Sequence, residues 1–285
     1  IGAEMPEENL NQDLYKGFEV VLGHRNQIRD FRYSVSLNFA LTRKMNRKLV
    51  EGDAVNSYDR WRGKYSNRYS DMGWGYGSNG QYTSMEDIWN SPDQDGKGGS
   101  TLLPGDWKYE DWNPNVFEFS NSNPKMTYGA TVTANWKGFD LNILFQGGAG
   151  FNVRYLEQLQ YPLCFGGNGL SHFYDRYHQD EEGNWIAGKW PTTRDPAACQ
   201  SNLKDSQQTT QDASYLRLKS IELGYTIPLK FTRKFKVDRC RIFANGYNLF
   251  TITGLDFVDP ERTSGSYGYL YPIMRNFNFG LNLSF

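Results

Sequence analysis

Alternation of apolar and polar residues is the main pattern along this chain. The clearest run covers residues 31–42, where apolar side chains from Phe31 to Leu41 occupy every second position and mostly small polar residues lie between them. Further runs, some of them weaker, cover 15–28, 128–136, 139–146, 214–228, 239–252 and 277–285. A period of two is typical of a β-strand with one apolar face, so the sequence predicts about seven strands.

The connections between these runs alternate between short and long. The short ones lie at 29–30, 137–138 and 229–238, and the longer ones cover 43–124, 151–212 and 253–272. In an antiparallel meander this order puts every short turn at one end of the sheet and every long loop at the other. Outer-membrane β-barrels have short periplasmic turns and long extracellular loops. The pattern therefore favours part of a transmembrane barrel over a soluble all-β domain, which alternation alone would also fit.

The composition narrows the choice further. Aromatic residues make up 16% of the chain, its formal net charge is −1 and its mean hydropathy is −0.70. No apolar run approaches the ~20 residues of a spanning helix, which excludes helical membrane proteins and leaves barrels open, because barrel strands carry polar residues on the inner face. The charge gives no basic face for a nucleic acid. The first residues contain no initiator Met or signal region, so we expect the chain to begin inside a longer polypeptide.

The polar positions of the alternating runs predict the surface that would face the interior of a barrel. The eight residues that we expect there, lining a transport path or touching a plug, are Ser34, Ser36, Asn38, Thr131, Thr133, Asn135, Asn142 and Gln146.

The two long loops hold most of the Trp and Tyr residues that lie outside the strands. Flat aromatic faces stack on sugars or pack against a partner protein. Candidates for contact with a substrate or a lid are Trp74, Tyr76, Tyr82, Trp89, Trp107, Trp112, Trp185 and Trp190. The alternative is that these rings pack among themselves as a core for the loops, and we favour this alternative for most of them.

Catalytic and metal-binding patterns are weak. His172 and His178 lie near an acidic run but match no known metal spacing, and we find no nucleophile in a catalytic context, so we expect no enzyme. Asp106 and Asp111 form a weak candidate for Ca²⁺, and otherwise no cofactor is expected. Cys164 and Cys199 could form a disulfide if their loop faces an oxidising space, although the sequence does not fix this pairing.

Several stretches of the chain resemble a known family. ASYLRLKSIELGYTIP at 213–228, RIFANGYNLFTITG at 241–254, DPE at 259–261 and YPIMRNFNFGLNLSF at 271–285 are similar to the end of SusC-like (RagA-like) TonB-dependent transporters of Bacteroidetes. Further similar stretches are YKGFEVVL, FRYSVSLNFA, GYGSNGQYTSMEDI, LPGDWKYEDWN and YGATVTANWKGFDLNILFQGG, in the family's order. Together they cover a little over half of the chain, whereas 43–73 and 151–212 match nothing we can name.

The resemblance implies a fold, a location and partners. Transporters of this family have a barrel of about 22 strands, closed by an N-terminal plug and covered by a SusD-like surface lipoprotein. They import glycans or peptides through the outer membrane with energy from TonB. This chain, 1–285, would be the C-terminal part of the barrel without the plug, with 43–124 and 151–212 extracellular. Where the family often has an Asp-x-Asn-Gly-Asp-Gly run, residues 110–115 read EDWNPN, which makes a cation there doubtful.

The C-terminal stripe resembles the signal by which the barrel-assembly machinery recognises its substrates. This stripe consists of Phe277, Phe279, Leu281, Leu283 and Phe285. A lipid-facing strand ending in an aromatic girdle would show the same residues, and both interpretations can hold together. The alternative function for the chain is a surface β module that binds glycans without transporting them. An upstream plug would favour transport, and a lipoprotein signal directly before this segment would favour the module.

Overall fold

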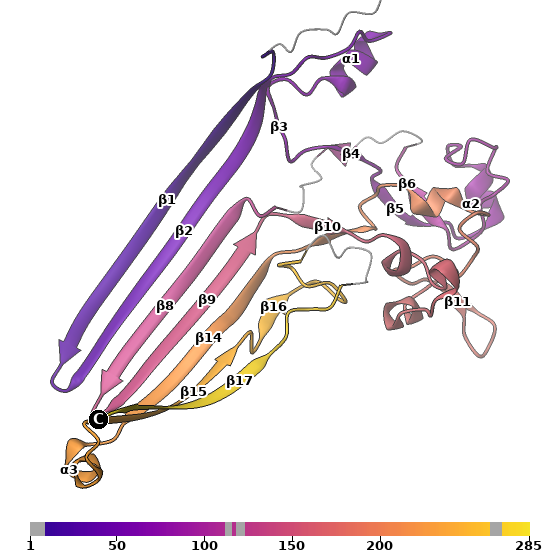
Figure 1. Ribbon diagram of the computed structural model, residues 1–285. Coiled ribbons are helices and arrows are strands. Elements are labelled where there is room, and N and C mark those ends of the chain that lie inside the picture. The colour runs from indigo at the N-terminus through magenta and orange to yellow at the C-terminus, as the bar shows by residue number, and fades with distance from the viewer. Residues whose placement is uncertain (1–8, 112–115, 118–122, 263–269) are drawn as a thin grey trace, which may run out of the picture.

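Seven long strands form one antiparallel sheet in the computed structural model, which describes residues 9–111, 116–117, 123–262 and 270–285 (Figure 1). The spatial order is β1-β2-β8-β9-β14-β15-β17, which is also the order along the chain. The strands are β1 (Gln12–Ile28), β2 (Phe31–Lys48), β8 (Met126–Trp136), β9 (Phe139–Ala149), β14 (Tyr215–Thr226), β15 (Arg239–Tyr247) and β17 (Asn276–Ser284). The predicted all-β meander is therefore confirmed.

The strand register sorts the side chains onto two faces, because directly paired residues of neighbouring strands point to the same side. Val35 pairs with Val132 and Val132 pairs with Ile143, which aligns the apolar positions of three strands. The alignment continues through Ile221 on β14 and reaches the C-terminal stripe, where Ile242 pairs with Leu281. We call this the apolar face, and the opposite side the polar face.

The apolar face is open rather than buried. Leu37 is 45% exposed and Leu281 is 55% exposed, and the ring of Phe279 is 84% exposed. A sheet whose apolar side chains lay inside a soluble domain would cover them. The arrangement matches a wall with an outward apolar surface, as the alternating runs predict.

Four of the long strands are longer than the pattern predicts. β8 begins at Met126 rather than at residue 128, and β9 continues to Ala149 rather than ending at residue 146. β1 begins at Gln12 rather than at residue 15, and β2 continues to Lys48 rather than ending at residue 42. The added part of β2 carries Arg43, Lys44 and Arg47. Since these residues are charged, the apolar alternation stops although the backbone ladder continues.

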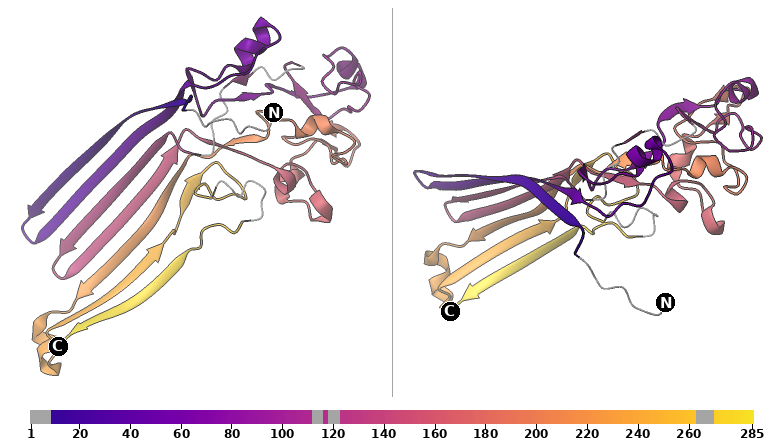
Figure 2. Two further views of the ribbon diagram at one scale, coloured as in Figure 1. Left: turned by 45° about the horizontal axis from the view of Figure 1, so that its top comes forward. Right: turned by 90° about the horizontal axis from the view of Figure 1, so that it is seen from above.

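The short connections lie together at one end of the sheet, and the long ones lie at the other (Figures 1 and 2). In the turn between β8 and β9, Lys137 and Gly138 have φ values of 46° and 92°, the left-handed pair that tight hairpins favour. The third short connection, between β14 and β15, contains helix α3 (Leu229–Thr232) and the 3₁₀ turn η5 (Arg233–Phe235). Residues 29–30 form the remaining turn.

At the opposite end the long loops fold into a separate lobe of short elements (Figure 2). Its paired strands are β4 (Trp74–Gly75) with β7 (Val116–Phe117), β5 (Ser78–Gln81) with β6 (Trp107–Tyr109), β10 (Asn152–Arg154) with β13 (Thr210–Asp212), and β11 (His178–Gln179) with β12 (Trp185–Ile186). The helical elements at this end are α1 (Ser57–Gly63), α2 (Met85–Trp89), η1 (Glu157–Leu159), η2 (Cys164–Gly166), η3 (Ser171–Tyr174) and η4 (Gln200–Leu203). Two short strands, β3 (Arg68–Tyr69) and β16 (Thr251–Thr253), extend the main sheet beside β2 and β14.

The sheet does not close on itself. Within the described residues, β1 and β17 each pair with one neighbour only, so one edge of each strand is unpaired. In the described part of the chain no helix is long and apolar enough to cross a membrane.

Candidate functional site: the loop lobe and the polar face

Both long loops contribute to one lobe, which is held by hydrogen bonds between segments far apart in the sequence. The Tyr76 backbone N–H donates to the carbonyl of Asp205 at 2.8 Å, and the Gln207 N–H donates back to the Tyr76 carbonyl at 3.1 Å. The Tyr109 hydroxyl donates to the Ser201 carbonyl at 2.8 Å. Parts of the predicted loops 43–124 and 151–212 are therefore folded together rather than forming two independent excursions.

A cluster of aromatic rings forms the core of this lobe. Trp190 packs against Trp107, His172 and Phe173, with ring centroids 5.7, 4.7 and 5.3 Å away. Its ring is also parallel to that of Tyr155, with an interplanar angle of 4°. Trp107 and Trp190 are 1% and 2% exposed. These rings form the hydrophobic core of the lobe, because removing their apolar surfaces from water is favourable.

The third loop is tied into the same core. The Tyr155 hydroxyl donates to the carbonyl of Asp256, and burial raises the pKa of this phenol to about 12. Phe257 lies against His172, with ring centroids 4.9 Å apart. All three long connections at this end thus meet around one set of rings.

The predicted contact aromatics divide into core and surface residues. For Tyr82, Trp107 and Trp190 the prediction of substrate or lid contact is wrong, because all three are buried among other side chains. Trp74 and Tyr76 are half-buried, with Trp74 packed edge-on to Trp61 at 4.8 Å. Trp89 and Trp185 remain open to contact, being 72% and 56% exposed. Trp112 lies outside the described residues.

Asp106 holds the two loops together instead of forming a cation site. Its buried carboxylate forms an ion pair with Arg194 and accepts hydrogen bonds from the Leu103 N–H and the Asn202 side-chain amide, both at 2.8 Å. With these donors around it, the carboxylate has no free direction for Ca²⁺. Asp111 has a partner of its own. Among the described residues no group of three or more His, Cys, Asp or Glu side chains could hold a metal.

The cysteines of the lobe are buried and unpaired. Cys164 and Cys199 are both free thiols, so the structure contains no disulfide between them. Cys199 lies beside Asp106, with its sulfur 3.4 Å from a carboxylate oxygen. Burial, together with the charge of Asp106, raises the pKa of the Cys199 thiol to about 11. This thiol is therefore a protonated packing group, not a nucleophile.

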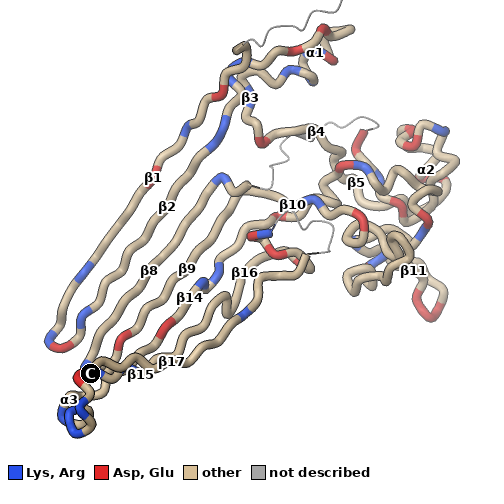
Figure 3. Tube along the Cα trace, in the orientation of Figure 1, with Lys and Arg blue, Asp and Glu red and all other residues tan. Residues whose placement is uncertain are grey.

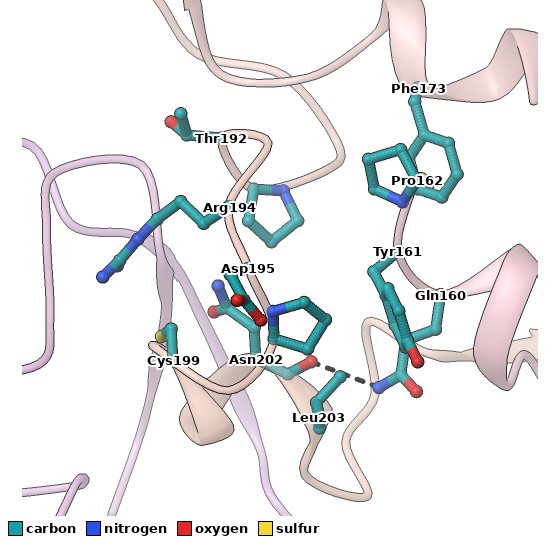
Figure 4. Close-up of a pocket in the computed structure, with 12 residues that line it drawn as sticks. Gln160, Tyr161, Pro162, Phe173, Thr192, Arg194, Asp195, Cys199, Asn202 and Leu203 are labelled. Atoms are coloured by element: carbon teal, nitrogen blue, oxygen red, sulfur yellow. Dashed lines mark hydrogen bonds between the residues drawn. The ribbon is translucent and has the colours of Figure 1, made fainter. Parts of the chain in front are cut away.

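A small cleft opens on the lobe between residues 160–162 and 191–203 (Figure 4). Its cavity has a volume of only about 30 Å³ and is lined by Tyr161, Pro162, Phe173 and Pro191, with Arg194 at one side. The Gln160 side chain donates to the Asn202 carbonyl at 3.1 Å and closes the floor. We call this the proline cleft.

Two exposed apolar side chains stand beside the proline cleft. Leu163 and Phe165 are 60% and 82% exposed and flank a second depression that shares Tyr161 and Pro162 with the first. Both have left-handed backbone angles, with φ of 60° and 51°. Bulky residues rarely adopt this conformation, and such strain concentrates at functional positions. Leu163 and Phe165 belong to no periodic run or motif in the sequence, although the pairs Tyr-Pro, Trp-Pro and Asp-Pro in this loop indicate a rigid surface.

A larger groove lies where the third loop meets the sheet. Its volume is about 770 Å³, and its lining includes Thr251, Phe257, Tyr271 and Arg275. One wall is the buried Arg217 of β14, which bonds both Asp259 carboxylate oxygens at 2.9 and 2.8 Å and also pairs with Glu261. Lys219 adds a second cation to Glu261 at 2.8 Å. We call this set the Arg217 latch. It anchors the third loop to the polar face. In the sequence, the DPE stretch at 259–261 gives no sign of this contact apart from the family resemblance.

The eight polar strand residues predicted to face a barrel interior lie on one side of the sheet. Asn38 pairs with Gly129, Ser34 pairs with Thr133, and Thr133 pairs in turn with Asn142, so all of them occupy the polar face. Val21 and Phe243 are apolar exceptions on this face. Whether this face lines a transport path stays a prediction.

The polar face also carries a charge network near the short-turn end. The Arg241 guanidinium donates to Asp140 at 3.0 Å and to Glu222 at 2.7 Å, which joins β9, β14 and β15. Asn245 donates to the second Glu222 oxygen and accepts from Asn278 of β17. Figure 3 shows these charges as isolated red and blue points on long tan strands. Their side chains satisfy one another, as a solvated or covered polar wall requires.

The chain is similar in sequence to known TonB-dependent receptors. No family model matches the chain. It is 25% identical to TonB-dependent receptor P3 of Formosa agariphila over 98% of its own length, and 24% identical to TonB-dependent receptor P26 of the same organism over 57%. The chain spans 29% of the length of the first relative and 17% of the second.

Solved structures agree on the fold. The chain superposes on a RagAB peptide transporter structure with a TM-score of 0.68 and 20% identity, covering 98% of this chain and 30% of that one. RagAB peptide importer structures in the open-open and closed-closed states give TM-scores of 0.65 and 0.64. The resemblance to TonB-dependent receptors that the sequence indicated is confirmed, and the solved structures show the same fold. The proteins matched are receptors and transporters, not enzymes.

Proposed function

We propose that this chain is the C-terminal wall and the extracellular loop lobe of an outer-membrane, TonB-dependent importer of glycans or peptides. The observation that carries the proposal is the open sheet, in which an exposed apolar face crosses all seven strands while every long loop lies at one end. A wall of this kind needs lipid on its apolar side. The similarity to TonB-dependent receptors over 98% of the chain supports the same assignment.

The unpaired edges indicate that the wall is completed by other strands. In lipid, each backbone N–H or C=O group without a partner costs several kcal/mol. Two edges would cost tens of kcal/mol in total, more than the ~5–15 kcal/mol stability of a domain. The remaining strands, a plug and a segment that contacts TonB would come from the rest of a longer polypeptide.

In this proposal the two regions have separate tasks. The polar face lines the path or touches the plug, with Asn38, Thr131 and Gln146 among its residues. The lobe presents exposed apolar groups to a substrate or to a SusD-like lipoprotein lid. Phe165, Tyr174 and Trp89 are the strongest candidates for this contact, being 82%, 80% and 72% exposed. The RagAB peptide importer structures, solved in open and closed states, support a partner at the mouth.

Uptake by the full-length protein tests this function. A strain that lacks the protein should lose uptake of one class among labelled oligosaccharides and peptides, and a strain that lacks TonB should lose the same uptake. Restoring the full-length protein should restore both transport and outer-membrane residence. A protein that folds in the outer membrane but supports no TonB-dependent uptake of any tested class would sink the proposal.

The exposed rings of the lobe favour one alternative, a surface module that binds glycans without transporting them. The same strains separate the two functions. Glycan retention on the cell surface that persists without TonB, with no internal label, would favour the module.

In the transporter, the Phe165→Ala substitution should weaken capture, whereas Tyr161→Phe beside it keeps the aromatic ring and should leave capture nearly unchanged.

The C-terminal stripe gives a test of the assembly partner. Phe279→Ala with Phe285→Ala should lower the amount of folded protein in the outer membrane, because the barrel-assembly machinery would read this apolar stripe. Asn278→Ala with Asn282→Ala changes the other face of the same strand and is the matched control. Heat-modifiable mobility of the extracted protein measures the folded amount. Equal loss in both variants would point to a packing effect and against recognition of the stripe.

A further inference from the structure

The connection between β14 and β15 has a composition unlike that of the other short turns. Residues 229–239 carry five cations, Lys230, Arg233, Lys234, Lys236 and Arg239, against the single acid Asp238. Figure 3 shows them as a dense blue group at α3, beside the C-terminus. The other two connections at this end are two-residue turns. We call residues 229–239 the basic turn.

The cations of the basic turn have no acidic partners within it or around it. All five are exposed, and in the part of the chain that the structure describes none of the ion pairs includes any of them. Lys230 instead lies 4.8 Å from the centre of the Phe231 ring. By contrast, Arg217 and Arg241 on the polar face are each held by two carboxylates. The positive charge of the turn is therefore available to an external anion.

Apolar side chains are exposed between these cations. Phe231 and Phe235 are 53% and 78% exposed, and Leu229 is 44% exposed. Thr232 is the one buried residue of α3 and η5. Rings between cations on one short segment form an amphipathic surface that can enter an interface from the aqueous side.

The position of the basic turn supplies the second observation. The apolar face ends at this side with a row of rings: Phe139 and Tyr225 lie 4.5 Å apart, and Trp136 is paired with Phe139. Aromatic belts of this kind mark the level of the lipid headgroups. The Thr226 N–H donates to the Gly138 carbonyl at 2.8 Å, so β14 leaves the sheet at the level of the β8–β9 turn. The basic turn extends beyond that level, where headgroup phosphates lie.

We propose that the basic turn is a lipid anchor that binds anionic phospholipid headgroups at the short-turn rim of the barrel. The phosphates would contact Lys230, Arg233, Lys234 and Lys236, while Phe231 and Phe235 insert among the headgroups. A protein partner fits less well, since a specific interface covers roughly 800 Å² per partner and the neighbouring turns add few residues. The inference rests on the proposed function only in placing this rim at a membrane surface.

The test uses the full-length protein in a neutral detergent, with fluorescent phosphatidylglycerol or phosphatidylcholine added as the probe. The variant K230Q/R233Q/K234Q/K236Q should bind phosphatidylglycerol at least about tenfold more weakly, because each cation near an anionic surface contributes to binding, and should leave phosphatidylcholine binding unchanged. The variant F231S/F235S should weaken binding of both lipids. The matched control R47Q/K48Q/R60Q/K97Q removes four exposed cations from the other end and should bind both lipids as the unmodified protein does.

Each outcome decides the inference. Unchanged phosphatidylglycerol binding in the first variant, or an equal loss in the control variant, overturns it. The inference is also overturned, in favour of a protein partner, if the basic turn cross-links to a periplasmic protein and the four-cation variant loses this cross-link but binds lipid as before. Heat-modifiable mobility checks that every variant is folded. If lipid selectivity follows the prediction but the protein supports no uptake, the transport proposal fails and the lipid anchor stands. If the protein supports uptake but shows no lipid selectivity, the lipid anchor fails and the transport proposal stands.

Discussion

The sheet and the loop lobe treat apolar side chains in opposite ways. Among the buried hydrophobic residues of the described chain, only Tyr215 and Leu218 belong to a long strand, and the others lie in the loops or their short strands. β1 and β17 bury no side chain at all. Yet both regions are rich in aromatic and leucine side chains. Apolar content therefore does not explain why the lobe buries its apolar side chains and the sheet exposes them. We attribute this difference to the solvent around each region.

The difference shows which force stabilises each region. In water, the lobe gains its stability from removing rings such as Trp107 and Trp190 from solvent. The sheet removes few side chains from solvent and depends on its backbone ladder, and in the proposed function lipid covers its apolar face. A substitution should consequently be judged by the solvent of its region. Buried rings matter most in the lobe, and the choice of face matters most in the sheet.

Removing a core ring from the lobe should have the largest effect. Trp190→Ala deletes the ring that contacts Trp107, His172 and Phe173, and large-to-small changes at such sites cost about 3–5 kcal/mol. We expect hydrogen exchange of the lobe amides to accelerate strongly while the heat-modifiable mobility of the barrel is unchanged. Trp185→Ala is the control, since that exposed ring stacks only on Tyr177 and its loss should cost less than about 1 kcal/mol. If Trp190→Ala also unfolded the barrel, the two regions would not be independent.

Placing a charge on each face of one strand tests the sheet in the same way. Val132→Arg puts a cation on the apolar face in the middle of β8, which should cost about 2–4 kcal/mol in lipid. Thr133→Arg, one residue further, puts the same charge on the polar face beside Ser34 and Asn142 and should cost less than about 1 kcal/mol. Unfolding of the reconstituted full-length protein in urea measures both. Equal costs for the two variants would show that the faces are assigned wrongly or that lipid does not cover this sheet.

The sheet was predictable from the sequence because successive side chains of a strand point to opposite faces, so apolar and polar residues alternate with a period of two. The runs at 31–42 and 277–285 give the strands, the face of each side chain and the order of the meander. Strand ends were less predictable, as the charged extension of β2 to Lys48 shows, because hydrogen bonding there continues without an apolar stripe. The alternation of apolar and polar residues marks only the part of a strand that has an apolar face. It does not show how far the backbone hydrogen bonding continues beyond that part.

The lobe could not be predicted in the same way. Its residues follow no period, so Tyr82 and Trp190, both buried, look in the sequence like the exposed Trp89 and Trp185. Which rings are covered depends on contacts such as Gln81 with Trp190, 109 residues apart. The Arg217 latch was missed for the same reason, since Asp259 lies 42 residues further along the chain. Only tertiary packing determines these choices.

The smallest expected effect is a pH dependence confined to the lobe. His172 lies among Trp190, Phe173 and Phe257, and burial lowers its pKa below the ordinary value of 6.5. The unfolded lobe would therefore take up a proton at this residue before the folded lobe does. Stability is fully present above pH 6.5 and falls as the pH drops from there through the folded pKa, where the loss levels off.

His172→Gln should remove this dependence, because the glutamine amide reaches the position of the His172 Nε2 and can still donate to the Leu159 carbonyl, but it does not titrate. We expect lobe exchange rates, corrected for intrinsic pH effects, to rise between pH 7 and pH 5 more steeply in the unmodified protein than in the variant. The slope should stay below the about 1.4 kcal/mol per pH unit of one full proton, since the imidazole is only partly shielded from water. Barrel stability should show no difference between the two proteins, because the contacts that the structure describes for this ring, with Tyr155, Leu159, Phe173, Trp190 and Phe257, all lie in the loops. A parallel shift in the barrel would mean that the lobe and the sheet unfold as one unit.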